Sequence, residues 1–140
     1  METLWIIYAL LSAIFAALVA IFGKIGVRDV DSTLATSVRA FVMFIFLLLV
    51  ILATKKYSEV NTIDKNSLLF IVLSGIAGAI SWIFYFMALK FGPASKVATV
   101  DRTSLVFVMV FSALLLGEKV TITKSIGILL VVTGSILVII

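Results

Sequence analysis

The chain has 140 residues, of which 64% are hydrophobic and only 13% are charged, and it contains neither cysteine nor histidine. Soluble domains are about half apolar and about a quarter charged, so this composition predicts a chain embedded in a lipid bilayer. The missing cysteine and histidine exclude disulfides, thiolate chemistry and imidazole metal sites. The formal charge of +4 is spread over short loops. This pattern indicates contact with lipid headgroups rather than nucleic acid, and we expect no cofactor.

Five apolar segments are each long enough to cross the hydrocarbon core of a bilayer as a helix. The expected spans are 4–22, 34–53, 68–89, 97–116 and 122–140. The first follows Met1-Glu2-Thr3, which carries no positive charge, so we interpret it as a retained span rather than a signal peptide. No linker divides the chain. The sequence therefore predicts an all-α membrane protein, a bundle of five transmembrane helices in a single domain of residues 1–140.

Short connections join the five spans, and short connections make neighbouring helices antiparallel. Gly92 and Pro93 end the third span, because proline cannot continue a helix. Oxygen-bearing side chains stand where helices begin and can cap them. These candidate caps are Asp31 or Ser32 for the second helix and Thr121 or Thr123 for the fifth.

The positive charges do not assign an orientation to the chain. The side of the membrane that holds residue 1 also holds Lys55, Lys56, Lys65, Lys119 and Lys124. The opposite side holds Lys24, Arg28, Lys90 and Lys96, together with Arg39 and Arg102 at or inside helix ends. Two interpretations follow. Either one unusual loop sets a single topology, or the chain inserts in both orientations.

Two charged residues are expected at matching depths inside the membrane, although such placement is costly. Arg39 lies about five residues into the second helix, and Asp101 lies at a similar depth in the fourth, entering from the same side. Adjacent Asp101 and Arg102 point about 100° apart on a helix, so Arg39 is the better partner for Asp101. The pair is a candidate gate or ion-coupling site. A static salt bridge and headgroup-level charges remain the alternatives.

Polar and aromatic side chains mark possible cavity walls. In the third helix Ser74, Gly78, Ser81 and Tyr85 share one face, with Gly75 and Trp82 beside it. The glycines favour close helix packing over a site, and hydroxyls can also bond to their own helix. The expected substrate pocket consists of Ser12, Ser81, Trp82, Tyr85, Ser104 and Val108. The fifth helix, with Gly127 and Gly134, is predicted to be an interface or a lipid-facing brace.

Glu118 follows the fourth span, where the helix dipole disfavours an anion. It needs a cation from Lys119, Lys124, Lys55 or Lys56 on the same side of the membrane. We therefore interpret Glu118 as a helix-end anchor rather than part of a site.

Several motifs together resemble the EamA unit of the drug/metabolite transporter superfamily. They are the run Ala88–Ser95 (ALKFGPAS), Asp101-Arg102, Leu116-Gly117-Glu118, the arginine near the start of the second helix, and the glycine-containing last helix. The resemblance covers essentially the whole chain. EamA proteins usually carry two such units in opposite orientation, which makes ten spans, so this chain would be equivalent to half of a ten-helix transporter and similar to the single-unit bacterial and archaeal members.

The resemblance implies a secondary transporter of a small metabolite or drug-like compound in the cell membrane. Transporters built from inverted repeats hold their site at the repeat interface. A single unit would rebuild that interface by forming an antiparallel homodimer of dual topology, or by pairing with a homologous chain. The alternative is a non-transporting membrane subunit that braces or regulates a larger complex. An enzyme is not expected, because the sequence shows no nucleophile–base pair, metal cluster or phosphate-binding loop.

Overall fold

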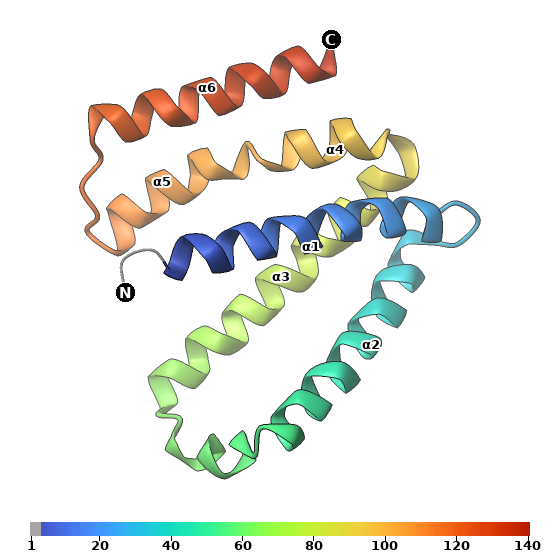
Figure 1. Cartoon of the computed structure of the whole chain (residues 1–140), viewed down its shortest axis with the longest axis vertical. Helices are drawn as coiled ribbons and strands as arrows, with labels where there is room; N and C mark the ends of the chain where they lie inside the picture. The colour runs from blue at the N-terminus through green and yellow to red at the C-terminus, as the bar shows by residue number, and fades with distance from the viewer. Residues whose placement is uncertain (1–3) are drawn as a thin grey trace. The chain divides into compact units, whose positions relative to one another are not determined.

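The computed structural model describes residues 4–140, which form helices and no strands. Figure 1 shows the elements in chain order. They are α1 (Leu4–Gly26), α2 (Ser32–Ala53), the 3₁₀ helix η1 (Lys56–Thr62), α3 (Lys65–Phe91), α4 (Ala94–Asp101), α5 (Ser104–Leu115) and α6 (Ile122–Ile139). Five helical segments are long and apolar enough to cross a membrane, with α4 and α5 together forming the fourth, Ala94–Leu115. The predicted all-α membrane fold is confirmed.

The observed spans are longer than the predicted ones at several ends. α1 continues through Gly23 to Gly26, and α3 begins at Lys65 and ends at Phe91. Unpaired backbone groups are costly in an apolar environment, so a helix gains by continuing across residues of poor helix propensity. The chain divides into two compact units, residues 4–24 with Phe91–Ile140 and residues Ile25–Lys90. The predicted single domain of 1–140 stays a prediction, and its residues 1–3 lie outside the described part of the chain.

The unit Ile25–Lys90 contains α2, η1 and α3. Asp31, one of the two predicted candidates, caps α2, because its carboxylate accepts hydrogen bonds from the backbone N–H groups of Thr33 and Leu34, each at 3.0 Å. At the far end of the unit's sequence, the Lys90 ammonium donates to the carbonyl of Val30 at 3.0 Å. This bond joins the C-terminal end of α3 to the segment that precedes α2.

The other unit contains α1, α4, α5 and α6. α4 and α6 pack against each other and run antiparallel, because Thr99 meets Ser135 and Lys96 meets Ile139. The buried hydroxyl of Ser135 donates to the carbonyl of Thr99 at 3.2 Å and to that of Val131, in its own helix, at 2.8 Å. α6 therefore packs against α4 through a buried hydroxyl, and its role as an interface or a lipid-facing brace stays a prediction. Thr121 caps α6 by accepting from the Lys124 N–H at 3.3 Å.

The fourth span is not one continuous α-helix. α4 ends at Asp101, and α5 begins at Ser104. Across the intervening Arg102-Thr103 the backbone bonds reach back three residues rather than four, as in a 3₁₀ turn. The Thr103 hydroxyl also donates to the Val100 carbonyl at 2.7 Å, and such local bonds compete with the regular helix pattern. The structure thus places a break directly after the one acid expected inside the membrane.

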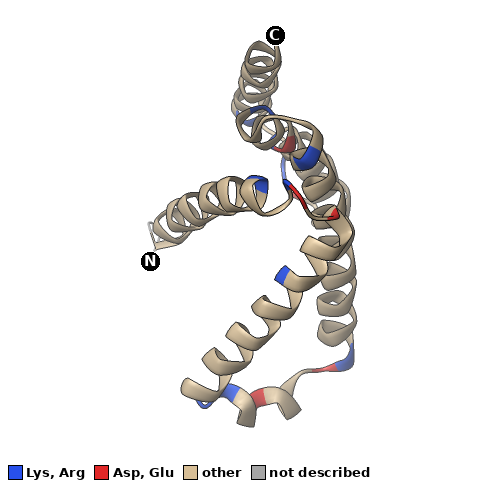
Figure 2. Cartoon of the chain, turned by 90° about the vertical axis from the view of Figure 1, so that its right-hand side faces the viewer, with Lys and Arg blue, Asp and Glu red and all other residues tan. Residues whose placement is uncertain are grey.

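The spans expose their apolar side chains almost completely. In none of the five is more than 6% of the most apolar stretch buried. Figure 2 shows that the charged residues gather mainly at helix ends and in the connections, whereas the helix bodies are largely uncharged. Water would make such exposure very unfavourable, whereas the hydrocarbon of a bilayer accommodates it.

We predict a pH-dependent contribution from Asp64, which precedes α3. Its carboxylate accepts from the backbone N–H groups of Asn66 and Ser67 at 3.1 Å each. The hydroxyl of Ser67, and then the backbone bonds, lower the pKa of Asp64 from its ordinary value of 3.8. Because the folded pKa is the lower one, this stabilisation is complete above pH 3.8 and is lost as the pH falls through the folded value.

The measurement is the unfolding midpoint in detergent micelles from about pH 6 down to about pH 3, for the wild type and Asp64→Asn. The asparagine still caps the helix but does not titrate. The wild type should therefore lose stability relative to the variant at the acid end. Asp64→Ser, a second neutral cap, should behave like the asparagine. Parallel curves for wild type and variants would contradict the prediction.

Candidate functional site

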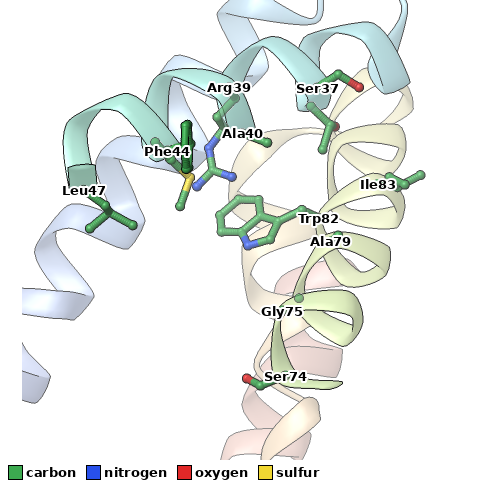
Figure 3. Close-up of a pocket in the computed structure, with 13 residues that line it drawn as sticks. Ser37, Arg39, Ala40, Phe44, Leu47, Ser74, Gly75, Ala79, Trp82 and Ile83 are labelled. Atoms are coloured by element: carbon green, nitrogen blue, oxygen red, sulfur yellow. The ribbon is translucent and has the colours of Figure 1, made fainter. Parts of the chain in front are cut away.

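The guanidinium of Arg39 stacks on the indole of Trp82 within the unit Ile25–Lys90. Arg39 lies on α2 and Trp82 on α3, and the Cζ atom lies 3.5 Å from the centre of the ring (Figure 3). A second ring, that of Phe86, lies 5.6 Å from the same atom. Both Arg39 and Trp82 are half-buried, whereas Phe86 is buried. Cation–π attraction strengthens as water is removed. The contact therefore links the two membrane spans α2 and α3 where both side chains are partly shielded from solvent.

Three aromatic rings on α3 support the arginine. The Trp82 ring meets the Tyr85 ring edge-on with centres 5.5 Å apart, and it lies 5.8 Å from the ring of Phe86. Edge-on and tilted rings pair favourably because the positive edge of one faces the negative face of the other. The cluster fixes the orientation of Trp82 and hence the position of the cation on its face.

A cavity of about 490 Å³ opens beside this contact, between α2 and α3 (Figure 3). Its size is typical of a small-molecule site. Arg39 is the one charged residue among those that line it. The others are Thr36, Ser37, Ala40, Met43, Phe44, Leu47, Ser74, Gly75, Gly78, Ala79, Trp82 and Ile83. The cavity therefore combines one cation, one indole and a few hydroxyls with apolar walls.

The cavity uses a different face of α3 from the one predicted. Ser74 and Gly78 lie on the predicted polar face, and Gly75 and Trp82 were expected beside it. Ala79 joins them in the lining of the cavity, whereas Ser81 and Tyr85 do not line it. The observed face is turned from the predicted one by roughly one residue, about 100°. The predicted face was chosen because its side chains are polar. The observed face is the one on which Trp82 contacts Arg39. Tyr85 contacts Trp82 from behind, and Ser81 is exposed.

The α2 wall was missed by sequence reasoning, apart from Arg39 itself. Its residues follow helical spacing on both sides of the arginine, at 36, 40, 43, 44 and 47. Counting three, four and eight residues from the arginine finds Thr36, Met43 and Leu47 but misses the other three lining residues of α2, Ser37, Ala40 and Phe44. The signal was available but weak, because most of these residues are apolar and resemble any lipid-facing stripe.

The other predicted pocket residues lie in the second unit. Ser12 on α1 and Ser104 at the start of α5 are exposed and line neither this cavity nor the second one described below. Asp101 is the last residue of α4, directly before the helix break, and is exposed. Its predicted pairing with Arg39 would join the two units and stays a prediction.

A second cavity, of about 670 Å³, lies among α1, α5, α6 and the connection between the last two. Val108 lines it from α5, and Trp5 lines it from α1. Its charged lining residues are Glu118 and Lys119 in the connection and Lys124 in the first turn of α6. Among them the Glu118 carboxylate lies 3.6 Å from the Lys124 ammonium, with both side chains more than half exposed. Such a pair contributes at most about 1 kcal/mol, and a helix-end role for Glu118 stays a prediction.

Glu118 owes its position to Gly117. This glycine has a φ of +67°, which side chains rarely adopt, so the chain can turn sharply after α5. The turn lets the Glu118 N–H donate to the Ser112 carbonyl at 3.2 Å.

Comparison with known proteins decides the family. The model of the EamA-like transporter family matches residues 3–140. The chain belongs to this family. It is also 39% identical, over 137 residues, to a Sinorhizobium protein described as "Uncharacterized transporter in cobO 3'region". The match covers 98% of this chain and 97% of that relative, so the two have nearly the same length. No solved structure matches the chain. Family and helices together identify a multi-pass membrane transporter.

We predict that Arg39 and Trp82 stabilise the fold as a coupled pair. A double-mutant cycle with Arg39→Leu and Trp82→Leu should give a coupling energy of about 0.5 to 2 kcal/mol. The measurement is denaturant unfolding in mixed micelles. Phe84 provides the matched control, because its ring is 66% exposed on the same helix. A cycle of Arg39→Leu with Phe84→Leu should be additive, and equal coupling in the two cycles would refute the pair.

Proposed function

We propose that the protein is a secondary transporter of a small metabolite or drug-like compound, working by alternating access in the cell membrane. The observation that carries this proposal is the cavity between two membrane spans, with Arg39 stacked on Trp82 at its wall. Charged residues inside spans mark substrate or ion pathways more often than structural sites. In a chain of a transporter family, such a cavity is the best candidate for the substrate site.

The proposed working form is an antiparallel dimer, either of two copies with dual topology or of this chain with a homologous one. Three observations support it. Positive charges are balanced between the two sides of the membrane. The spans leave their apolar faces largely uncovered. The Sinorhizobium relative has nearly the same single-unit length. An antiparallel pair would restore the inverted repeat on which alternating access commonly depends.

The proposed gate is an ion pair between Arg39 and Asp101. In an antiparallel dimer each copy would contribute one such pair near an opposite membrane face, so that closing one side is linked to opening the other. Asp101 stands at the end of α4, beside a 3₁₀ turn. Mid-helix turns of this kind often mark hinges. Asp101 is also the proposed coupling group for protons. Of the predicted pocket residues, Trp82 lines the proposed substrate site, and Ser12, Ser81, Tyr85, Ser104 and Val108 stay predictions.

We predict that Arg39→Ala and Asp101→Ala each keep the fold but lose transport. Purified protein in vesicles would be screened against amino acids, polyamines and drugs, and the variants would be tested with the transported compound. Removing a charged hydrogen-bonding partner should slow transport by about tenfold to a hundredfold. Size-exclusion profile and helix content should remain those of the wild type. Unfolding of both variants would show instead that the charges only hold helices together, as in a non-transporting subunit.

Proton coupling has a separate test in the same vesicles. Asp101→Asn removes the titrating group with little change in size. We expect the variant to lose transport driven by a pH gradient while it retains exchange without one. Full pH-driven transport by Asp101→Asn would exclude coupling through this residue.

Dual topology predicts that the C-terminus is found on both sides of the membrane. Two fusions at Ile140 test it, one with a reporter active only in the cytoplasm and one with a reporter active only outside. Both should be active, because the charge bias between the two sides is close to zero. Adding three lysines to the connection between α2 and α3 should shift activity toward one reporter. Activity of a single reporter in the unmodified chain would rule out the homodimer and require a heterologous partner.

A further inference from the structure

Stacking on Trp82 leaves the guanidinium edge of Arg39 unused within the unit Ile25–Lys90. The guanidinium is planar and carries its five N–H donors in the plane, so stacking uses its face and leaves its edge. Trp82 occupies that face at 3.5 Å. Within the unit Ile25–Lys90, Arg39 donates no hydrogen bond and forms no ion pair. The edge therefore offers donors beside a cavity without an acceptor from the same unit.

The charge of this cavity is not balanced by its own lining. None of its thirteen lining residues is acidic. The acids of the unit are Asp29, Asp31, Glu59 and Asp64, which all lie in connections outside α2 and α3. A cation in surroundings of low polarity is strongly stabilised by a nearby anion. The geometry that suits a planar guanidinium best is a carboxylate, which accepts two parallel hydrogen bonds.

The remainder of the cavity suits an apolar group. Met43, Phe44 and Leu47 continue the wall along α2 beyond Arg39. Across from them, Gly75 and Gly78 have open space where a side chain would begin, with no atom within 4 Å of a Cβ placed at either. The hydroxyls of Thr36 and Ser37 already donate to the carbonyls of Ser32 and Thr33. These walls therefore offer few free donors and a broad apolar surface.

We infer that the ligand of this cavity is an apolar carboxylate. Its carboxylate accepts hydrogen bonds from the edge of Arg39, and its apolar body packs against Trp82 and the α2 wall, above the two glycines. As a statement about the transported substrate, the inference rests on the proposed function. As a statement about binding, it stands on the cavity alone.

Three probes with one body and different head groups test this inference: 3-phenylpropanoate, 3-phenylpropan-1-ol and 3-phenylpropan-1-amine. Binding to purified protein in lipid nanodiscs is followed by the fluorescence of Trp82. A Trp5→Phe background makes that signal specific, because the chain has two tryptophans. The carboxylate should bind at least about tenfold more tightly than the alcohol, and the amine should bind most weakly. A carboxylate that binds no better than the alcohol, or an amine that binds best, overturns the inference.

Substitutions then test whether Arg39 causes the preference for the carboxylate over the alcohol. Arg39→Gln should abolish the difference between carboxylate and alcohol while alcohol binding, which reports an intact cavity, is retained. Arg28→Gln removes a cation that does not line the cavity and should leave the preference unchanged. If Arg39→Gln does not fold, Arg39→Lys decides, because lysine keeps the charge but loses the paired donors. A reduced preference supports the inference, and an undiminished preference in either Arg39 variant overturns it.

Transport of the same probes in vesicles separates this inference from the proposed function. Selective binding of the carboxylate without any transport would refute the transporter proposal and leave the binding site standing. Transport without preference for the carboxylate would support the proposed function and overturn the inference.

Discussion

The stacking of Arg39 on Trp82 is the interaction on which the candidate site depends. It joins α2 to α3 through one contact, in which the Cζ atom of Arg39 lies 3.5 Å from the centre of the Trp82 ring. Its benefit is greatest where water is scarce, which is where an arginine is otherwise most costly. The ring meets the face of the guanidinium and leaves the edge unused. One contact thus holds the helices and presents donors to the cavity.

The two units show how differently a membrane chain can satisfy its polar groups. Between α4 and α6, a buried serine and a lysine each bond to a backbone carbonyl of the neighbouring helix. In α2, the hydroxyls of Thr36 and Ser37 bond back to their own helix, and Arg39 is the one charged residue that lines the cavity between α2 and α3. The first arrangement holds two helices together, whereas the second leaves the N–H donors of Arg39 for a ligand in the cavity. This contrast supports a ligand site between α2 and α3 rather than at the contact between α4 and α6.

The fourth span differs from the other four because its helix is interrupted between α4 and α5. A continuous helix was expected there, but Thr103 bonds to Val100 and the turn tightens around Arg102. Asp101 consequently stands at a helix end within the span rather than in the middle of a regular helix. A helix end is easier to reorient than a helix body, since fewer backbone bonds must change. The proposed gate therefore combines a charge with a place where the backbone can move.

The sequence by itself determined the number of spans and the presence of an arginine inside the second span, and it limited the caps of two helices to two candidates each, from which the structure selects Asp31 and Thr121. These follow from local physics, because the length of an apolar run and the residue at a helix start act without distant contacts. Only the tertiary structure decided which face of α3 forms the cavity, that Trp82 rather than Ser81 faces Arg39, and that α2 supplies the opposite wall. Those features depend on the rotation of one helix against another, and helical periodicity does not specify it when nearly every face is apolar.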